Sequence, residues 1–460
     1  MIIIHIPVKK KIYINKKSMC FYGGTMKNFF KIILLGGVVL ALFIFLKNFY
    51  IDNNIVVKDE KIGYSEKYKG LKGAVDIVSN NQGDFYIAYK DRIQLIDAKG
   101  KSYDILKNKT LNIKSLEYKD NILYYSSDTK VYSYNLAGKE EKVIINALPN
   151  LGDYKDSIIR IKGNELYVSI GAATNSGVVG RDNEWLKDNP YYCDISPKDI
   201  TIKGRTYGNE KTGAFVPYMT KNASGQVISA HSPGNASIVQ YNMENGNLET
   251  YAWGIRNAKG MAFNSEGKLI ATIGGMEDRG LRPVKGDVDY IYEIKKGLWY
   301  GWPDYSGGDP LTSPRFKGVD NNKLNFILDN HPTTNPPAPI YQHKSLSSLG
   351  SMNVDTKGIL GEKNCIYFYD TRDNTIYKLT NKGVLSEMLE LKDASFVSSI
   401  KFNDNSMLML DSAKGVLYSI SKQNSSPIFS LSNDVMYYLI IIVLIGIITA
   451  VWKFNYNNNK

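Results

Sequence analysis

The chain has 460 residues, of which 43% are hydrophobic and 22% are charged. This composition is too apolar for a disordered chain and is sufficient for a large core. The formal net charge is +12, and nine of the positive charges are lysines in the acid-free segments 1–31 and 453–460. The rest of the chain is left with about +3, which is too little for a phosphate-binding face and argues against nucleic-acid binding.

The N-terminal region is predicted to be a cytoplasmic segment followed by a transmembrane helix. Residues 1–27 form the basic segment, in which Met26 is a candidate for the true start because it opens MKNFFKIILLGG. Ile32–Leu46 carries no charge, and with flanking lysines that can snorkel it predicts a span over 28–50. The alternative is a cleaved signal peptide, which the absence of a small-residue cleavage site after the apolar run disfavours. A linker over 51–72 is expected to follow.

The next region contains a repeat of two short strands around a polar turn. Six copies occur, at 75–89, 115–127, 158–171, 260–274, 350–370 and 398–411. Each alternates apolar and polar residues and is too small to close a core alone, whereas a ring of such units can do so. The predicted fold class is therefore all-β, a six-bladed β-propeller over 73–421, flanked by an N-terminal and a C-terminal transmembrane helix. A β-sandwich is the alternative, since strand spacing does not separate the two.

The spacing of the copies indicates where extra segments lie. Successive copies start 40, 43, 102, 90 and 48 residues apart, whereas one blade needs about 40 residues. The segments 172–259 and 275–349 are therefore predicted to be long insertions after the third and fourth copies. Such insertions are expected on loops at one face, where function usually lies.

The C-terminal region mirrors the N-terminal one. A linker over 422–434 leads to Val435–Trp452, which is apolar, uncharged and long enough to span a bilayer. A short cytoplasmic tail, 453–460, carries Lys453 and Lys460. The positive flanks predict a two-pass protein of the cell membrane with both termini cytoplasmic and the propeller extracellular. Cys193 and Cys365 would lie outside, either as a disulfide or as two buried thiols.

The two insertions and their flanks hold a set of distinctive motifs. They are LYVSIGAATNSGVVG (166–180), PKDITIKG (197–204), TGAFVPY (212–218), YAWGIRNAKGMAF (251–263), DRGLRPV (278–284) and LWYGWPDYSGGDPL (298–311). Together they resemble the glucose/sorbosone dehydrogenase family, closest over 158–345. The combination of G-x-R-N with YGWP about 45 residues later carries most of the likeness. The resemblance implies a six-bladed propeller that uses pyrroloquinoline quinone (PQQ) and Ca2+ to oxidise a sugar.

The resemblance also implies roles for particular residues. Arg256 and Asn257 match the R-N pair and are predicted to bind the cofactor, the alternative being that Arg256 only ties loops together. Gly274 and Gly275 lie where the family binds calcium, and Asp287 and Asp289 could add charge there, the alternative being a solvated turn.

The catalytic acid and base of the family do not carry over. Gly171 is followed by Ala172 instead of an acid, and no histidine precedes that strand. His343 is the candidate replacement base, although a hydrogen-bonded or surface histidine is the simpler interpretation, and Lys344 beside it could bind cofactor carboxylates.

Aromatic residues around GWP form another candidate site. Trp299, Trp302 and Tyr305 could stack on a sugar, or they could pack beneath the propeller loops.

Two functions from different classes remain open. The first is a membrane-tethered, extracytoplasmic oxidoreductase of a sugar or related alcohol, passing electrons to a membrane acceptor. The alternative is a non-catalytic carbohydrate- or ligand-binding propeller derived from such an enzyme. The missing acid and histidine favour the second, and the density of family motifs favours the first.

Overall fold

The computed structural model describes residues 55–80, 82–392 and 394–423, with Ile441, Ile445 and Thr449. The chain divides into two compact units, Met1–Asn54 and Ile55–Lys460, and all the described residues belong to the second unit.

The second unit is built from six antiparallel sheets, which we number blades 1 to 6 in the order of their first strands. Blade 1 consists of β3 (Ala74–Ser79), β4 (Phe85–Tyr89), β5 (Arg92–Ile96) and β6 (Ser102–Lys107). Blade 2 consists of β7 (Ile113–Lys119), β8 (Ile122–Ser127), β9 (Lys130–Asn135) and β10 (Glu140–Ile145). Blade 3 consists of β11 (Ile159–Lys162), β12 (Glu165–Ile170), β15 (Ser237–Asn242) and β16 (Leu248–Trp253). Blade 4 consists of β17 (Ala258–Phe263), β18 (Leu269–Ile273), β19 (Tyr290–Ile294) and β22 (Tyr341–Gln342). Blade 5 consists of β23 (Leu349–Asp355), β24 (Cys365–Asp370), β25 (Thr375–Leu379), β26 (Leu385–Leu391) and β1 (Ile55–Val57). Blade 6 consists of β27 (Val397–Phe402), β28 (Met407–Asp411), β29 (Val416–Lys422) and β2 (Ile62–Lys69).

The first strands of the blades form a closed ring. β3 contacts β7, and the contacts continue through β11, β17, β23 and β27 and return to β3. This closure distinguishes a propeller from a sandwich and confirms the predicted six-bladed β-propeller. Each of the six sequence repeats is the first hairpin of one blade, as predicted.

The core lies between neighbouring blades. Strands such as β4 are buried on both faces because a blade packs against one neighbour on each side. One hydrophobic cluster joins each adjacent pair of blades; Ile77 and Leu408, for example, belong to the cluster between blades 1 and 6. Local chemistry sets the hairpins: between β17 and β18 the Asn264 carboxamide accepts the backbone N–H groups of Glu266 and Lys268, and Gly267 takes a φ of +77°.

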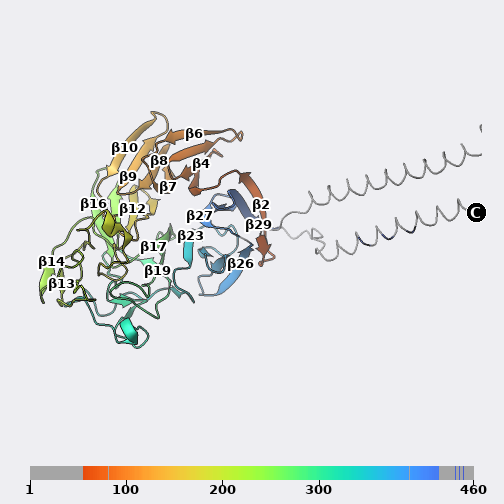
Figure 1. Ribbon diagram of the computed structural model, residues 1–460. Coiled ribbons are helices and arrows are strands. Elements are labelled where there is room, and N and C mark those ends of the chain that lie inside the picture. The colour runs from red at the N-terminus through yellow and green to blue at the C-terminus, as the bar shows by residue number, and fades with distance from the viewer. Residues whose placement is uncertain are drawn as a thin grey trace, which may run out of the picture. The chain divides into compact units, whose positions relative to one another are not determined.

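The ring is closed by a strand from the beginning of the described chain. β2 pairs with β29 as the outermost strand of blade 6, and Figure 1 shows the red strand β2 beside the blue strand β29. β1 adds a fifth strand to blade 5 by pairing with β26. Both strands fall in 51–72, the segment expected to be a linker.

The insertions lie within blades 3 and 4 and not after them. The first runs from 171 to 236, between β12 and β15, and contains β13 (Ile200–Ile202), β14 (Gln226–Ile228) and the 3-10 helix η1 (Glu184–Lys187). The others are 274–289, between β18 and β19, and 295–340, between β19 and β22, with β20 (Tyr305–Ser306), β21 (Asp309–Pro310) and η2 (Val319–Asn321). The sequence repeat ended at the first hairpin, so the outer strands of both blades were counted with the insertions.

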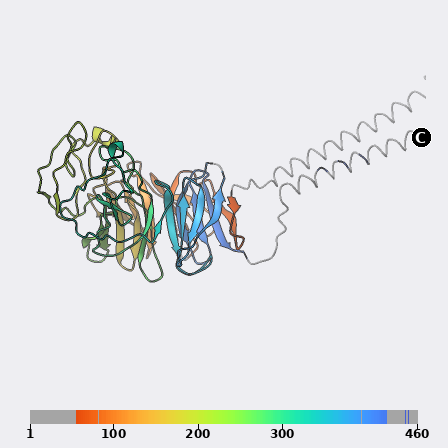
Figure 2. The ribbon, with the colours of Figure 1, turned by 90° about the horizontal axis from the view of Figure 1, so that it is seen from below.

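The insertions gather at one end of the propeller, which we call the loop face (Figure 2). Their side chains pack into a hydrophobic cluster of their own that includes Val178, Phe215, Trp302, Phe316 and Leu328. The loops that precede β11 and β17 reach the same face, because first and second strands are antiparallel.

The prediction of flanking transmembrane helices is contradicted. The expected span 28–50 lies outside the described residues, as does 435–452 apart from Ile441, Ile445 and Thr449. Within the part of the chain that the structure describes, no helix is long and apolar enough to cross a membrane. The named elements are strands and two 3-10 helices, so the predicted two-pass location in the cell membrane is corrected with the fold class.

Candidate functional site

A cavity of about 310 Å³ occupies the part of the central channel next to the loop face. All six first strands contribute to its wall, which identifies it as the channel; we call it the upper cavity. Serine hydroxyl groups line much of it: Ser115, Ser351, Ser398, Ser399 and Ser412.

Two polar side chains of the upper cavity have no protein partner. Asn257, which is buried, and Lys259 both line it, and neither side chain makes a hydrogen bond or ion pair within residues 55–80, 82–392 and 394–423. Lys114, also in the wall, differs because its Nζ lies 2.9 Å from an Asp156 carboxylate oxygen. An unpaired amide and an unpaired amine in one cavity are donors available to a ligand.

The electrostatics of Lys259 suit this interpretation. Its side chain keeps solvent access inside the cavity, but protein surrounds the amine, and this desolvation lowers its pKa. The carboxylate of Asp156 opposes the shift and the guanidinium of Arg256 adds to it.

A compact charge cluster closes the upper cavity away from the loop face. Lys401 Nζ lies 2.7 Å and Arg160 Nη1 lies 3.2 Å from the same Glu117 carboxylate oxygen. Buried Asp76 accepts hydrogen bonds from Ser399 Oγ at 2.6 Å and from a backbone N–H. Arg160 also lines a second cavity of about 300 Å³ on the other side of this cluster. Two acids and two bases balance here, so Lys259 is the unbalanced charge of the upper cavity.

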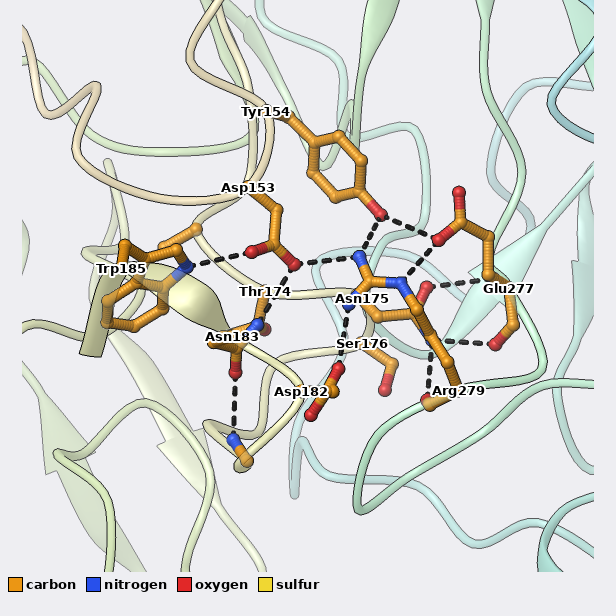
Figure 3. Close-up of polar contacts among 12 residues, drawn as sticks. Asp153, Tyr154, Thr174, Asn175, Ser176, Asp182, Asn183, Trp185, Glu277 and Arg279 are labelled. Atoms are coloured by element: carbon orange, nitrogen blue, oxygen red, sulfur yellow. Dashed lines mark hydrogen bonds and ion pairs between the residues drawn. The ribbon is translucent and has the colours of Figure 1, made fainter. Parts of the chain in front are cut away.

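A second polar cluster lies above the channel, among the loops of blades 3 and 4 (Figure 3). Arg279 contacts the carboxylates of Asp153, Asp182 and Glu277 at 2.7, 2.7 and 2.5 Å. Tyr154 accepts a hydrogen bond of 2.7 Å from the same guanidinium. Burial raises the pKa of Tyr154 to about 12 despite the opposing charge of a nearby arginine, so its hydroxyl remains protonated at neutral pH.

Arg256 is buried, and protein acceptors use its guanidinium on every side. Its Nε donates to the backbone carbonyl of Asn175 at 3.0 Å, and its Nη2 donates to the Asn175 side-chain oxygen at 2.9 Å and to Tyr154 Oη. Its Nη1 donates to the carbonyl of Gly274 at 3.3 Å, and its carbon lies 4.1 Å from the centre of the Tyr154 ring. Of the predicted pair, Asn257 therefore faces the cavity and Arg256 ties the loops together.

The residues predicted to bind metal lie together, but their oxygens already have donors. Asp289 accepts four backbone N–H groups at 2.8 to 3.1 Å, from Gly275 and from 347–349. Asp287 accepts the backbone N–H of Met276 and the Tyr290 hydroxyl, both at 2.6 Å. These carboxylates hold the turn at Gly275 against blade 5.

The structure places His343 and Lys344 away from the upper cavity wall. His343 is fully buried, with Nε2 2.8 Å from Asp370 and Nδ1 3.1 Å from the Tyr341 hydroxyl. Burial would raise the pKa of Asp370, but hydrogen bonds from His343 and backbone N–H groups outweigh it and lower the pKa. Lys344 is exposed and pairs with Asp373.

The aromatic residues around GWP pack inside the insertions. Trp299, Trp302 and Tyr305 are 2%, 5% and 6% exposed, which leaves little ring surface for a sugar to stack on. Trp302 Nε1 donates to the carbonyl of Asn175 at 3.1 Å, and Trp299 Nε1 donates to that of Trp302.

Sequence reasoning missed Lys259 and Arg279. Lys259 lies on β17 and Asn257 immediately precedes that strand. The register shift between Ala258 and Gly260 interrupts simple alternation there, so period-2 counting does not place the two side chains together. Arg279 lies in the quoted DRGLRPV stretch and Glu277 stands two residues before it, but Asp153 and Asp182 come from distant loops and no local signal joins them to it.

The central segment of the chain is similar to a known protein family. Residues 206–325, which include Asn257, Lys259 and Arg279, match the family model described as Glucose / Sorbosone dehydrogenase. A search of curated proteins gives no match.

Solved structures of similar fold include proteins from two fungi. The chain is similar to an iodide structure of a Trichoderma reesei Carbohydrate-Active Enzymes Family AA12 protein, with a TM-score of 0.55 and 15% identity over 80% of this chain and 98% of that one. A calcium structure of the same protein gives the same score. The holo form of the pyranose dehydrogenase PQQ domain from Coprinopsis cinerea gives 0.54 and 11% over 80% and 97%. At these identities the likeness establishes the fold, and the family model adds the resemblance of the central segment.

Proposed function

We propose that this propeller is an oxidoreductase that oxidises a sugar or a related alcohol with a quinone cofactor, and that its ligands bind in the upper cavity. The observation that carries the proposal is the pair of unpaired donors, Asn257 and Lys259, in an open cavity beneath the loop face. The pair lies in the segment that matches the Glucose / Sorbosone dehydrogenase model. The fold of this chain is also similar to that of the PQQ domain of a pyranose dehydrogenase.

The upper cavity suits a carboxylate-bearing quinone such as PQQ. An ammonium group and a carboxamide are good donors to a carboxylate, and Lys259 has no competing acid in hydrogen-bond contact. When bound, such a quinone would supply the hydride acceptor. The serine hydroxyls of the wall donate to protein oxygens and can still accept hydrogen bonds from the hydroxyl groups of a polar ligand.

The residues predicted to bind calcium do not fit that ion. Ca2+ takes about six to eight oxygen ligands, whereas Asp287 and Asp289 are occupied by protein donors and the Gly274 carbonyl accepts from Arg256. Within the described residues, no group of three or more His, Cys, Asp or Glu is placed to hold a metal ion. The proposal therefore includes a quinone and not calcium.

A second candidate is a ligand-binding propeller without catalysis. One observation favours it: Asp153, Tyr154 and Glu277, the polar groups nearest the family's missing acid and base, are all held by Arg256 or Arg279. None of them is free to take a proton from a substrate.

Cofactor titration followed by turnover separates the two candidates. PQQ is added to the full chain and binding is followed by quinone absorbance; dye reduction is then measured with a panel of aldoses and sugar alcohols. Binding with dye reduction supports the oxidoreductase, and binding without it supports the second candidate. A folded protein that binds no PQQ contradicts the quinone proposal.

A pair of lysine variants locates the binding site. Lys259→Gln removes the unbalanced charge of the cavity and is expected to weaken PQQ binding by at least about tenfold, the value of one charge-assisted hydrogen bond. Lys268→Gln, which removes a lysine held by Glu266 outside the cavity, is the matched control and should bind as the unmodified chain does. Equal binding by both variants would contradict the assignment of the upper cavity.

A further inference from the structure

Three acids converge on one arginine above the channel. Asp153 precedes β11, Asp182 lies in the first insertion, and Glu277 lies between β18 and β19, so the three come from separate loops. Figure 3 shows the Arg279 guanidinium between them, with ion pairs of 2.7, 2.7 and 2.5 Å. Each of its three nitrogens serves a different carboxylate.

Two of the three acids, Asp153 and Glu277, also accept hydrogen bonds from other protein groups. Asp153 also accepts from Trp185 Nε1 at 2.8 Å and from the Asn183 carboxamide at 2.9 Å. Glu277 also accepts from Ser347 Oγ at 3.0 Å, which brings the loop before blade 5 into the cluster. The donors are therefore all protein groups.

Electrostatics shows how tightly the cluster is held. Burial would raise the pKa of Glu277, but the charge of Arg256 and the hydrogen bond from Arg279 outweigh it and lower the pKa to about 2. Asp153, Asp182 and Glu277 carry three negative charges, and the positive charges of Arg256 and Arg279 neutralise two of them. Removal of Arg279 would leave three acids beside a single cation.

We propose that the Arg279 guanidinium is the resident cation of this loop cluster and takes the place of a divalent metal, so that the loop face is assembled without calcium. A guanidinium is charged at every accessible pH and offers five donors in a planar fork, which suits it to several carboxylates at once. The inference does not depend on the proposed function, because it concerns how the loops are held and not what they bind.

The unmodified chain gives the first test. Its thermal unfolding midpoint should agree within about 1 °C in EDTA and in excess calcium chloride, because a site without affinity adds no linkage energy. Terbium supplies a second readout, since an ion bound beside Asp153 would be excited by Trp185, whose indole contacts that carboxylate. We expect no sensitised emission; a saturable rise in midpoint or emission would overturn the proposal.

Arginine variants give the second test. Arg279→Gln should lower the midpoint by about 5 °C in EDTA, since it leaves partly buried acids unpaired. Calcium should then raise the midpoint of this variant by neutralising the three acids. The control is Arg315→Gln, which breaks a contact with the single carboxylate of Asp309 and should gain nothing from calcium.

The outcomes of the variant test are distinct. An Arg279→Gln midpoint equal to that of the unmodified chain would overturn the proposal, as would an equal calcium response in both variants. If Arg279→Gln does not fold, the terbium measurement on the unmodified chain decides the matter.

Discussion

Asn257 and Lys259 differ from their neighbour Arg256 in what remains for a ligand to bind. The guanidinium of Arg256 is used by Asn175, Tyr154 and Gly274, whereas the amide and the amine are free to bind. A single family motif thus contributes one residue to the framework and one to the cavity, and substitutions should separate the two roles.

Arg256→Ala is expected to destabilise the fold. The change removes the donor of several buried hydrogen bonds and leaves Glu277 beside one cation fewer, which should cost about 3 kcal/mol or more. Chemical denaturation measures this loss. An unchanged midpoint together with lost ligand binding would instead mean that Arg256 acts on the ligand directly.

Asn257→Ala is expected to leave stability nearly unchanged, within about 1 kcal/mol, because the Asn257 side chain has no partner in the described structure to lose. Binding of PQQ should weaken. Calorimetric titration together with thermal unfolding reads both quantities on one sample. A large loss of stability would show that the amide has a structural role.

The fall in the free energy of unfolding at acid pH should depend on Glu277. Its pKa is lowered to about 2 in the folded chain from an ordinary value of 4.5, so its stabilising contribution is present above pH 4.5 and is lost as pH falls toward 2. The contribution is at most about 3 kcal/mol at neutral pH. Glu277→Gln should flatten the fall in stability between pH 4.5 and 2, measured by urea unfolding. A parallel fall in both proteins would contradict this assignment.

Among the elements, the strands were predictable from sequence and the cluster of loops was not. The hairpins β3–β4 through β27–β28 were visible because alternating apolar residues on either side of a polar turn are local signals. The outer strands β15 and β19 were not, since 171–236 and 274–289 separate them from their partners. The contacts of Arg279 join residues about 100 positions apart, and no local pattern encodes them.

The transmembrane prediction relied on the apolar runs within 28–50 and 435–452 and on the lysines that flank them. It is contradicted because no helix among the described residues is long and apolar enough to cross a membrane. For Trp299 and Trp302 the sequence left both sugar stacking and packing beneath the loops open, and in the structure the two side chains lie in the core of the insertions.

The closing strand β2 allows a test at the scale of an element. Ile62 is 1% exposed and belongs to the cluster between blades 5 and 6, so Ile62→Ala should cost about 2 to 4 kcal/mol of unfolding free energy. Ile340→Ala, at a position 47% exposed, is the matched control and should cost less than about 0.5 kcal/mol. Equal losses would mean that β2 does not hold the ring closed.

At the scale of the whole molecule, the channel is divided into two compartments. The cluster of Asp76, Glu117, Arg160 and Lys401 separates the upper cavity from the cavity at the opposite end. A ligand that enters from the loop face therefore meets a neutral floor and one unbalanced amine, Lys259, in the wall.

The pairing of β2 with β29 also sets a schedule for synthesis. About 350 residues separate these two strands, and a ribosome adds roughly 5 to 20 residues per second. β2 therefore waits roughly 20 to 70 seconds for the strand that completes its sheet, with its backbone hydrogen-bonding edge unsatisfied. The first blades can form during this interval, but the ring can close only after the last blade has been made, so the nascent chain needs protection against mispairing at its beginning and not only at its end.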